Sequence, residues 1–376
     1  MQDPRSYFSD NQLFDLETLK QHCEHHGVWS NTSERFPNLT LLKYKDEVQW
    51  GDKPWTSFAR MSRGLVVDMK NQTILAHGFN KFFNINQQPE TNYEILKDQK
   101  GFEVSEKLDG SCLVSFLNPN DNQFYLTTTG SFDSEHGKVG TELFRQMLCC
   151  PKIAAYAAMG TFIFELIDAR FRIVINYRAK GYEDGLYLIG YRTREGRLLT
   201  YAEVQELATQ LALPCMNTYA FESLDQLIEK TKELPLSEEG YVLRYPDGLM
   251  VKIKGTAYLQ AHRFVSQLSD KHLLESLIEG VEDPLIEICP DEFRQEVVEK
   301  ITYFKLRKLD ILNQCYKYFA EAPKEDRKTF ALWVIKNVKP SLKGCLFQLI
   351  DCKPLKDKDL YGIIERTEKP STVTRI

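Results

Sequence analysis

The sequence lacks any run of about 18 apolar residues, so no membrane-spanning helix is predicted. Its nine cysteines are scattered and form no Cys-x-x-Cys pair, which argues against a zinc site or a disulfide framework and predicts a reducing, cytoplasmic environment. The polar N-terminus is not typical of a signal peptide. Internal repeats and low-complexity segments are also missing, and the net charge of -5 gives no overall basic signal for nucleic acid.

What is present is the composition of a globular protein, with 376 residues, 43% of them hydrophobic and 12% aromatic. This length suits two domains. Short apolar segments separated by turn residues predict strands between about residues 39 and 255, with helices near 136–150 and 201–212. The strands are expected at 39–44, 64–68, 112–116, 124–127, 161–165, 172–175, 186–191, 240–244 and 250–254.

Beyond residue 258 the pattern changes to the helical spacing of apolar residues, and strand signals nearly vanish. Helices are expected at 268–277, 291–319, 324–337 and 341–350. The predicted fold class is therefore α+β: a domain of mostly antiparallel sheets over 1–258, followed by an all-helical domain over 259–376. From residue 296 onward basic residues outnumber acidic ones, which indicates either a phosphate-contacting surface or an ordinary solvated helix surface.

A histidine cluster lies in a helix predicted over residues 10–26 and ending at Gly27. His22 and His26, four residues apart, would share one face of that helix, with Cys23 and His25 beside them. A metal site is one interpretation. Histidines that simply stabilise the last turn of a helix are the other.

The segment Lys107–Gly110 (KLDG) carries the strongest chemical signal. A lysine two residues before an Asp-Gly turn can act as a covalent nucleophile toward a nucleotide, provided that its amine is neutral. We therefore expect its pKa to be lowered by burial or by nearby cations such as Arg63, Lys252 and Lys254. A lone KLDG segment is a weak signal, since most lysines are solvated surface charges.

Other residues in the same region of the chain support a nucleotide site. Lys252 and Lys254 are two apart in a predicted strand and so share a face, which suits either a triphosphate or a solvent-exposed edge. Glu165 lies within an apolar strand and needs a partner there, for which a ribose hydroxyl or a metal would serve. Glu239 is placed to hold a divalent cation. Either carboxylate could instead form a structural salt bridge.

Arg63 heads a predicted strand and can present a planar fork to phosphate, and Lys81 precedes Phe82-Phe83-Asn84. In this order the segments resemble the phage-type RNA ligase 1 family, within the covalent nucleotidyltransferases. The resemblance spans about residues 40–350 and rests on the following segments: Tyr44, Arg63-Gly64, 81–86, 107–111, Phe164-Glu165 with 172–174, 186–192, 239–242, 252–254, Tyr258 and 326–331.

The resemblance implies that Lys107 is the catalytic nucleophile. It also implies a set of nucleotide-binding residues and a metal site, with Mg²⁺ expected and Mn²⁺ as an alternative. The binding set is Tyr44, Arg63, Lys81, Asp109, Gly110, Glu165, Glu239, Lys252, Lys254 and Tyr258. The metal residues are Glu239 and, in a loose match at the start of the helical domain, Asp283.

One departure stands out, because the family's archetype has lysines where this chain has Thr127–Thr129 before Gly130-Ser131. Hydroxyl groups at these positions could donate hydrogen bonds to phosphate but carry no charge.

The activity implied by the resemblance is ATP-dependent joining of 5′-phosphate and 3′-hydroxyl RNA ends through lysyl-AMP and RNA-adenylate. Cleaved tRNA is the expected substrate, and the helical domain is expected to bind RNA. We also expect a monomer, and a separate kinase or phosphatase that prepares the ends. A DNA ligase or capping enzyme is the nearest alternative, although those relatives follow the catalytic domain with a small β-barrel. A second alternative is an inactive RNA-binding protein that keeps the ligase fold.

Overall fold

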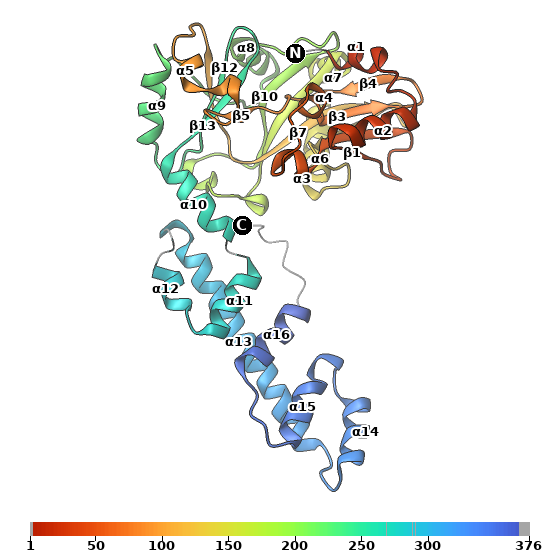
Figure 1. Ribbon diagram of the computed structural model, residues 1–376, viewed down its shortest axis with the longest axis vertical. Helices are drawn as coiled ribbons and strands as arrows, with labels where there is room; N and C mark the ends of the chain where they lie inside the picture. Colours follow the sequence, from red (N-terminus) through yellow and green to blue (C-terminus); the bar gives the residue numbers. More distant parts are fainter. Residues whose placement is uncertain (1–2, 268, 288, 290, 368–376) are drawn as a thin grey trace. The chain divides into compact units, whose positions relative to one another are not determined.

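The computed structural model describes residues 3–267, 269–287, 289 and 291–367. The chain divides into two compact units, Met1–Leu259 and Gln260–Ile376. Each unit has its own set of secondary-structure elements, and each is treated on its own (Figure 1).

Unit 1 is built from three sheets. The first has the order β1-β2-β3-β4 and the second β10-β9-β7-β8, while the third has the order β11-β6-β12-β13-β5. All strand pairs are antiparallel except β13 with β5. The predicted α+β class with mostly antiparallel sheets is therefore confirmed. The strands are β1 (Val28–Asn31), β2 (Leu39–Tyr44), β3 (Arg63–Asp68), β4 (Thr73–Ala76), β5 (Phe83–Asn84), β6 (Glu103–Glu106), β7 (Ser111–Asn118), β8 (Gln123–Thr128), β9 (Gly160–Ile167), β10 (Gly185–Thr193), β11 (Thr218–Tyr219), β12 (Gly240–Arg244) and β13 (Met250–Lys254).

Helices cover the sheets of unit 1. They are α1 (Pro4–Asp10), α2 (Leu16–His26), α3 (Asp46–Gln49), α4 (Ser57–Met61), α5 (Tyr93–Leu96), α6 (Glu135–Met147), α7 (Pro151–Met159), α8 (Tyr201–Leu211) and α9 (Leu224–Lys232). A tenth, α10 (Thr256–Gln267), begins at the end of unit 1. Figure 1 shows α2 and α4 beside the β1–β4 sheet and α9 beside β13.

Alternating strand residues divide the core of unit 1 into clusters. Leu41 and Val66 of the first sheet pack with Val114 and Ile163 of the second, so these two sheets share one core. The opposite face of the first sheet is covered by residues of α1, α2 and α4, among them Phe8, Leu19 and Phe58. The third sheet packs against Leu224 and Leu227 of α9. These packed layers fix the strand ends from which the site side chains project.

The N-terminal region differs from its prediction in one respect, because the helix expected over 10–26 begins only at Leu16, and a separate helix, α1, ends at Asp10. Residues 11–15 interrupt them, and the Asp15 side chain begins α2 by accepting a hydrogen bond from Thr18 N at 2.8 Å. The expected end at Gly27 is confirmed: its φ of 65° lies in the left-handed region that favours glycine.

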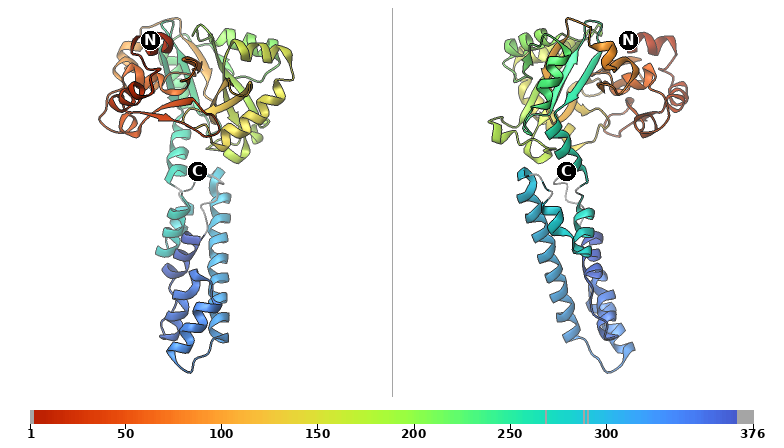
Figure 2. Two further views of the ribbon diagram at one scale, coloured as in Figure 1. Left: turned by 90° about the vertical axis from the view of Figure 1, so that its right-hand side faces the viewer. Right: turned by 60° about the vertical axis from the view of Figure 1, so that its left-hand side comes forward.

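The described part of unit 2 is helical and contains no strand. Its helices are α11 (Asp270–Glu279), α12 (Glu282–Glu287), α13 (Asp291–Glu321), α14 (Arg327–Asn337), α15 (Lys343–Ile350) and α16 (Asp357–Thr367). The long α13 contacts α15 and α16, as Figure 2 shows in blue. Searched over the described residues, neither unit has a helix long and apolar enough to cross a bilayer.

Candidate active site

The Lys107–Gly110 turn connects β6 to β7, and main-chain hydrogen bonds fix it on both sides. Lys107 N donates to Gly240 O at 2.8 Å, which ties the turn to β12. Asp109 N donates to the Tyr177 hydroxyl at 2.6 Å, and Gly110 N donates to Glu165 Oε1 at 3.0 Å. The nucleophile predicted from the sequence therefore stands on a backbone anchored to two sheets.

Gly110 is required by a close approach of two chain segments. A Cβ atom built at this position would lie 2.4 Å from the carbonyl oxygen of Leu166 in β9. A side chain here would push β7 away from β9 and would shift the lysine that precedes it. Gly110 thus supports the site through its small size.

Asp109 anchors two further segments to the turn. Its Oδ2 accepts from Val174 N at 2.9 Å and from Ile175 N at 3.0 Å, and its Oδ1 accepts from the Tyr258 hydroxyl at 2.7 Å. The strand predicted at 172–175 is wrong, because these amides face a buried carboxylate and pair with no neighbouring strand. Asp109 is only 5% exposed, and its carboxylate holds the turn against residues 174–175 and Tyr258.

Glu239 lies between two of the predicted lysines. Lys107 Nζ donates to its Oε2 and Lys254 Nζ donates to its Oε1, both at 2.9 Å. The carboxylate is only 2% exposed, whereas the Lys107 side chain is 22% exposed and can be reached from solvent. The neighbouring Gly240 has a φ of 144°, and a Cβ there would lie 2.1 Å from Ile253 O, so the chain needs glycine beside this carboxylate.

The pKa of Lys107 differs from the expectation. Burial alone would lower it, but the negative charges of Glu239 and Glu165 outweigh burial, and the pKa is raised. The prediction of a lowered pKa is wrong for the chain without ligands, because the nearest charge is a carboxylate and not a cation. The pKa of Glu239 is shifted downward. Burial alone would raise it, but the positive charges of Lys107 and Lys254 outweigh burial and hold the pKa below its usual value.

Lys252 shows the lowered pKa that was expected of the nucleophile. Burial, followed by the positive charges of Lys107 and Lys81, lowers the pKa of Lys252 to about 7. Its Nζ lies 5.8 Å from the centre of the Phe82 ring. Among the described side chains, no carboxylate pairs with it. Lys252 is therefore a cation held without a counter-charge, which favours binding of an anion.

Tyr44, Arg63 and Lys81 form the adjoining part of the site. Lys81 Nζ donates to the Tyr44 hydroxyl at 3.2 Å and to Gln49 Oε1 at 2.7 Å. Burial, followed by the charge of Arg63, lowers the pKa of Lys81 to about 8. The Arg63 guanidinium lies 4.0 Å from Cys112 Sγ. Arg63 and Lys81 thus act on each other as two cations, and within the described residues neither forms an ion pair with a carboxylate.

Glu165, on β9, is 8% exposed and has a main-chain partner, the amide of Gly110. Burial raises the pKa of Glu165 to about 7. The carboxyl is therefore poised to take up a proton near neutral pH. The partner seen here is protein backbone, where the sequence suggested a ribose hydroxyl or a metal.

The predicted metal residues lie in different units, Glu239 in unit 1 and Asp283 in unit 2. Searched over the described residues, the chain contains no group of three or more His, Cys, Asp or Glu side chains that could hold a metal ion. This search includes the histidine cluster. His22 bonds to the Tyr7 hydroxyl and His26 to Thr56 Oγ1, both at 3.0 Å, so these rings have structural partners.

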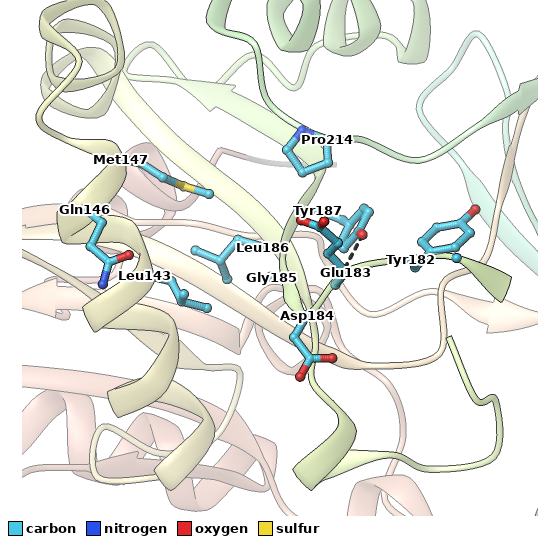
Figure 3. Close-up of a pocket in the computed structure, with 11 residues that line it drawn as sticks. Leu143, Gln146, Met147, Tyr182, Glu183, Asp184, Gly185, Leu186, Tyr187 and Pro214 are labelled. Atoms are coloured by element: carbon cyan, nitrogen blue, oxygen red, sulfur yellow. Dashed lines mark hydrogen bonds between the residues drawn. The ribbon is translucent and has the colours of Figure 1, made fainter. Parts of the chain in front are cut away.

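A cavity of about 840 Å³ lies beside the start of β10 (Figure 3). Its lining includes Leu143 and Met147 of α6, together with Tyr182 and Asp184. No lysine or arginine lines it, so it does not suit a polyphosphate.

Sequence reasoning missed several residues that complete the site. Tyr177 accepts from the nucleophile turn, Gln49 holds Lys81, and Phe82 lies between Arg63 and Lys252. The position of Phe82 beside Lys81 in the sequence was a usable signal. Gln49 lies shortly after Tyr44 and Tyr177 shortly after the 172–174 segment, but nothing in the residues around them marks a role in the site.

Comparisons with known proteins agree with this arrangement. Residues 61–259 match the profile of a family described as RNA ligase. A Thermovibrio ammonificans protein named "Putative RNA ligase" is 29% identical over 276 residues, which cover 69% of this chain and 67% of that protein. An Autographa californica nuclear polyhedrosis virus protein, named "Putative bifunctional polynucleotide kinase/RNA ligase", is 24% identical and is covered over 38% of its length.

Among solved structures, two forms of an archaeal ATP-dependent RNA ligase resemble the chain, each with a TM-score of 0.50 and 14% identity. The matches cover 86% and 94% of this chain, and 89% and 100% of those chains. At this identity they support the nucleotidyltransferase fold alone. The sequence match spans more than half of the chain and includes Lys107, Glu239 and Lys252. The protein belongs to the phage-type RNA ligase family.

Proposed function

We propose that this RNA ligase uses ATP to join a 5′-phosphate to a 3′-hydroxyl of RNA through a covalent lysyl-AMP intermediate. The observation that carries the proposal is the placement of Lys107 Nζ. It lies on an anchored turn, reachable from solvent, beside the half-buried cations Lys252 and Lys254. Such a cluster suits a triphosphate whose α-phosphorus gains charge as it is attacked.

The proposed reaction has three steps. The neutral amine of Lys107 attacks the α-phosphorus of ATP, forms a P–N bond and displaces pyrophosphate. The 5′-phosphate of RNA then attacks the same phosphorus, which breaks the P–N bond and gives RNA-adenylate. Finally the 3′-hydroxyl attacks the 5′-phosphate, forms the phosphodiester, loses its proton and releases AMP.

The remaining site residues divide between binding and positioning. We assign Arg63, Lys81, Lys252 and Lys254 to the phosphates of ATP, with Tyr44 fixing Lys81. Asp109, Gly110 and Tyr258 hold the nucleophile turn in place. Glu165 is assigned to the ribose, since a carboxyl with a pKa near 7 can accept or donate a hydrogen bond.

A divalent cation fits the donor set at Glu239, where each carboxylate oxygen now accepts from an ammonium group. Mg²⁺, or Mn²⁺ in its place, would be held there by one carboxylate and by phosphate oxygens, and would offset negative charge on the phosphates. Asp283 is a second proposed metal residue, within the helical unit. Glu239 would then no longer be available to keep Lys107 protonated.

We further propose that unit 2 binds RNA, that cleaved tRNA is the substrate, and that the enzyme acts as a monomer in the cytoplasm. A separate kinase would supply the 5′-phosphate ends, and a separate phosphatase would supply the 3′-hydroxyl ends. The basic character of the chain from residue 296 onward supports RNA binding. The viral relative is named as a kinase and a ligase together, which supports the need for end preparation.

The deciding experiment is to incubate the protein, freed of bound AMP, with Mg²⁺ and ATP labelled in the α-phosphate, and then to denature it. Label on the wild type that is absent from Lys107→Ala supports the covalent mechanism. Transfer of that label to 5′-phosphorylated RNA, and not to DNA or a capped end, supports the RNA substrate. Folded wild type without label would exclude the mechanism and favour an RNA-binding protein.

A further inference from the structure

The end of β8 and the turn that follows it lie close to the candidate active site and carry no charge. This segment, residues 127–131, is called the threonine turn and contains Thr127, Thr128, Thr129, Gly130 and Ser131. The hydroxyls of Thr127 and Thr128 donate to Ser131 O at 2.7 and 3.1 Å, so two of the three threonines are engaged within the turn itself. The turn therefore offers little of its own for binding an anion.

Lys43, from the end of β2, supplies a positive charge at this turn. A Cβ built on Gly130 would lie 2.7 Å from Lys43 Cδ and 3.3 Å from Lys43 Nζ. The lysine stem thus lies against the bare backbone of Gly130, where any side chain would displace it. Gly130 O accepts from Asn31 Nδ2 at 2.9 Å, which holds this part of the turn against β1.

Lys43 is half-buried, and within the described residues it forms no ion pair or hydrogen bond through its side chain. Its neighbour Lys45, by contrast, pairs with Glu24 at 2.6 Å. A lysine whose stem is packed while its ammonium has no partner is available to an anionic ligand.

The same turn touches the strand that carries Arg63. Lys43 and Arg63 are register partners in the β2–β3 pair. The next residue, Gly64, has a φ of 74°, and a Cβ there would lie 3.2 Å from Thr129 Cα. Lys43, the turn and the Arg63 backbone therefore meet in one place, at the edge of the nucleotide site.

We propose that Lys43 binds a phosphate group of the RNA substrate beside Thr129 and Gly130. It supplies there the charge that the threonine turn lacks. The inference rests on the proposed ligase function. RNA is favoured over ATP because Arg63, Lys81, Lys252 and Lys254 already provide four cations for one triphosphate, and an RNA strand brings further phosphates to the edge of that site.

The test uses Lys43→Met, which keeps the apolar stem against Gly130 and removes the charge. We expect the KM for a 5′-phosphorylated RNA to rise about tenfold, as for loss of one charge-assisted contact. The slope of log KM against log salt concentration should fall by about 0.7, the value for one phosphate contact on a single strand. Formation of lysyl-AMP should change less than threefold.

Lys70→Ala is the matched control. Lys70 is an exposed lysine just beyond the opposite end of β3, and no ion pair within the described residues holds it. An equal rise of KM in Lys70→Ala, an unchanged KM for RNA in Lys43→Met, or a rise confined to the KM for ATP would overturn the inference. These outcomes differ from failure of the ligase function itself, in which wild type forms no lysyl-AMP.

A charge relocation separates the role of the charge from that of packing. In Lys43→Met combined with Thr129→Lys, an ammonium group is supplied again, now from within the turn itself. Recovery of the KM for RNA to within threefold of wild type supports a phosphate bound at this turn. No recovery, in a double variant that still forms lysyl-AMP, would show that the phosphate is not bound there.

Discussion

Lys107 Nζ lies 2.9 Å from Oε2 of Glu239, so the candidate nucleophile is paired with a carboxylate. The carboxylate is buried and also accepts from Lys254. The pair keeps the amine protonated and therefore unreactive toward phosphorus. Activation then requires that a ligand of Glu239 weaken this pairing, which would link nucleotide and metal binding to the reactivity of Lys107.

Neutralising the carboxylate should make Lys107 a better nucleophile toward a small reagent. In Glu239→Gln the largest charge that opposes burial is removed and Glu165 remains, so the pKa of Lys107 falls and its neutral fraction rises at pH 8. We expect an amine-selective reagent to modify Lys107 at least about tenfold faster in this variant, as measured by peptide mass spectrometry. Formation of lysyl-AMP should nevertheless fall, because the proposed metal residue is lost.

Glu238→Gln is the control for this prediction, since Glu238 is adjacent in sequence but forms no ion pair with Lys107 among the described contacts. Equal labelling of Lys107 in both variants and in wild type would contradict the proposed control of the amine by Glu239.

Nucleotide affinity should fall as the pH rises through the neutral range. The pKa of Lys252 is about 7 and that of Lys81 about 8 in the free protein. Binding of a polyanion raises both pKa values, so above the free value each group must take up a proton for binding. With one such group the Kd rises about tenfold for each pH unit.

Isothermal titration with an ATP analogue that cannot react at the α-phosphorus, from pH 6 to 9, checks this prediction. Lys252→Arg is the matched variant, because arginine stays charged over the whole range. Its Kd should vary less with pH than that of wild type. A wild-type Kd independent of pH would show that neither lysine changes its charge on binding.

Much of this organisation could be predicted from the sequence. The short apolar segments predicted β2, β3, β7, β8, β9, β10, β12 and β13 but not the strands β1, β4, β5, β6 and β11. The helical spacing of apolar residues beyond residue 258 predicted the helical C-terminal region. The linear motifs gave residues that the fold brings together, such as Lys107, Glu239 and Lys254. Lys107 follows β6, Glu239 precedes β12 and Lys254 ends β13, and pairing of these strands brings the three residues together.

The parts that the sequence did not predict depend on contacts between distant segments. The sign of the pKa shift at Lys107 depends on which charge is nearest in space, and spacing along the chain does not tell that. Residues 172–175 are apolar enough for a strand, yet their amides satisfy Asp109. The role of Tyr177 could not be predicted either, since it comes from one hydrogen bond to Asp109, which lies 68 residues earlier in the chain.

That hydrogen bond should matter for both stability and activity. Tyr177→Phe leaves the buried amide of Asp109 without its acceptor, which costs about 1–2 kcal/mol of the free energy of unfolding. The nucleophile turn should also loosen, so we expect lysyl-AMP formation to slow several-fold. Urea unfolding and single-turnover labelling measure the two effects. Tyr182→Phe is the control, because that hydroxyl accepts only a long 3.4 Å bond from an exposed side chain, and it should behave as wild type.

The close approach at Gly110 gives the sharpest steric prediction. In Gly110→Ala the new Cβ would lie 2.4 Å from Leu166 O, and neither backbone can move without breaking the β7–β9 ladder. Overpacking of this kind costs about 1–3 kcal/mol and should displace Lys107 from the phosphate position. We expect lysyl-AMP formation to fall by more than about tenfold, since misplacement of a reacting group is costly.

Gly185→Ala, at a strand glycine with no atom within 4 Å of its Cβ position, should leave labelling and unfolding near wild type. Equal labelling by the two variants would mean that the Lys107–Gly110 turn is not held by its contact with β9.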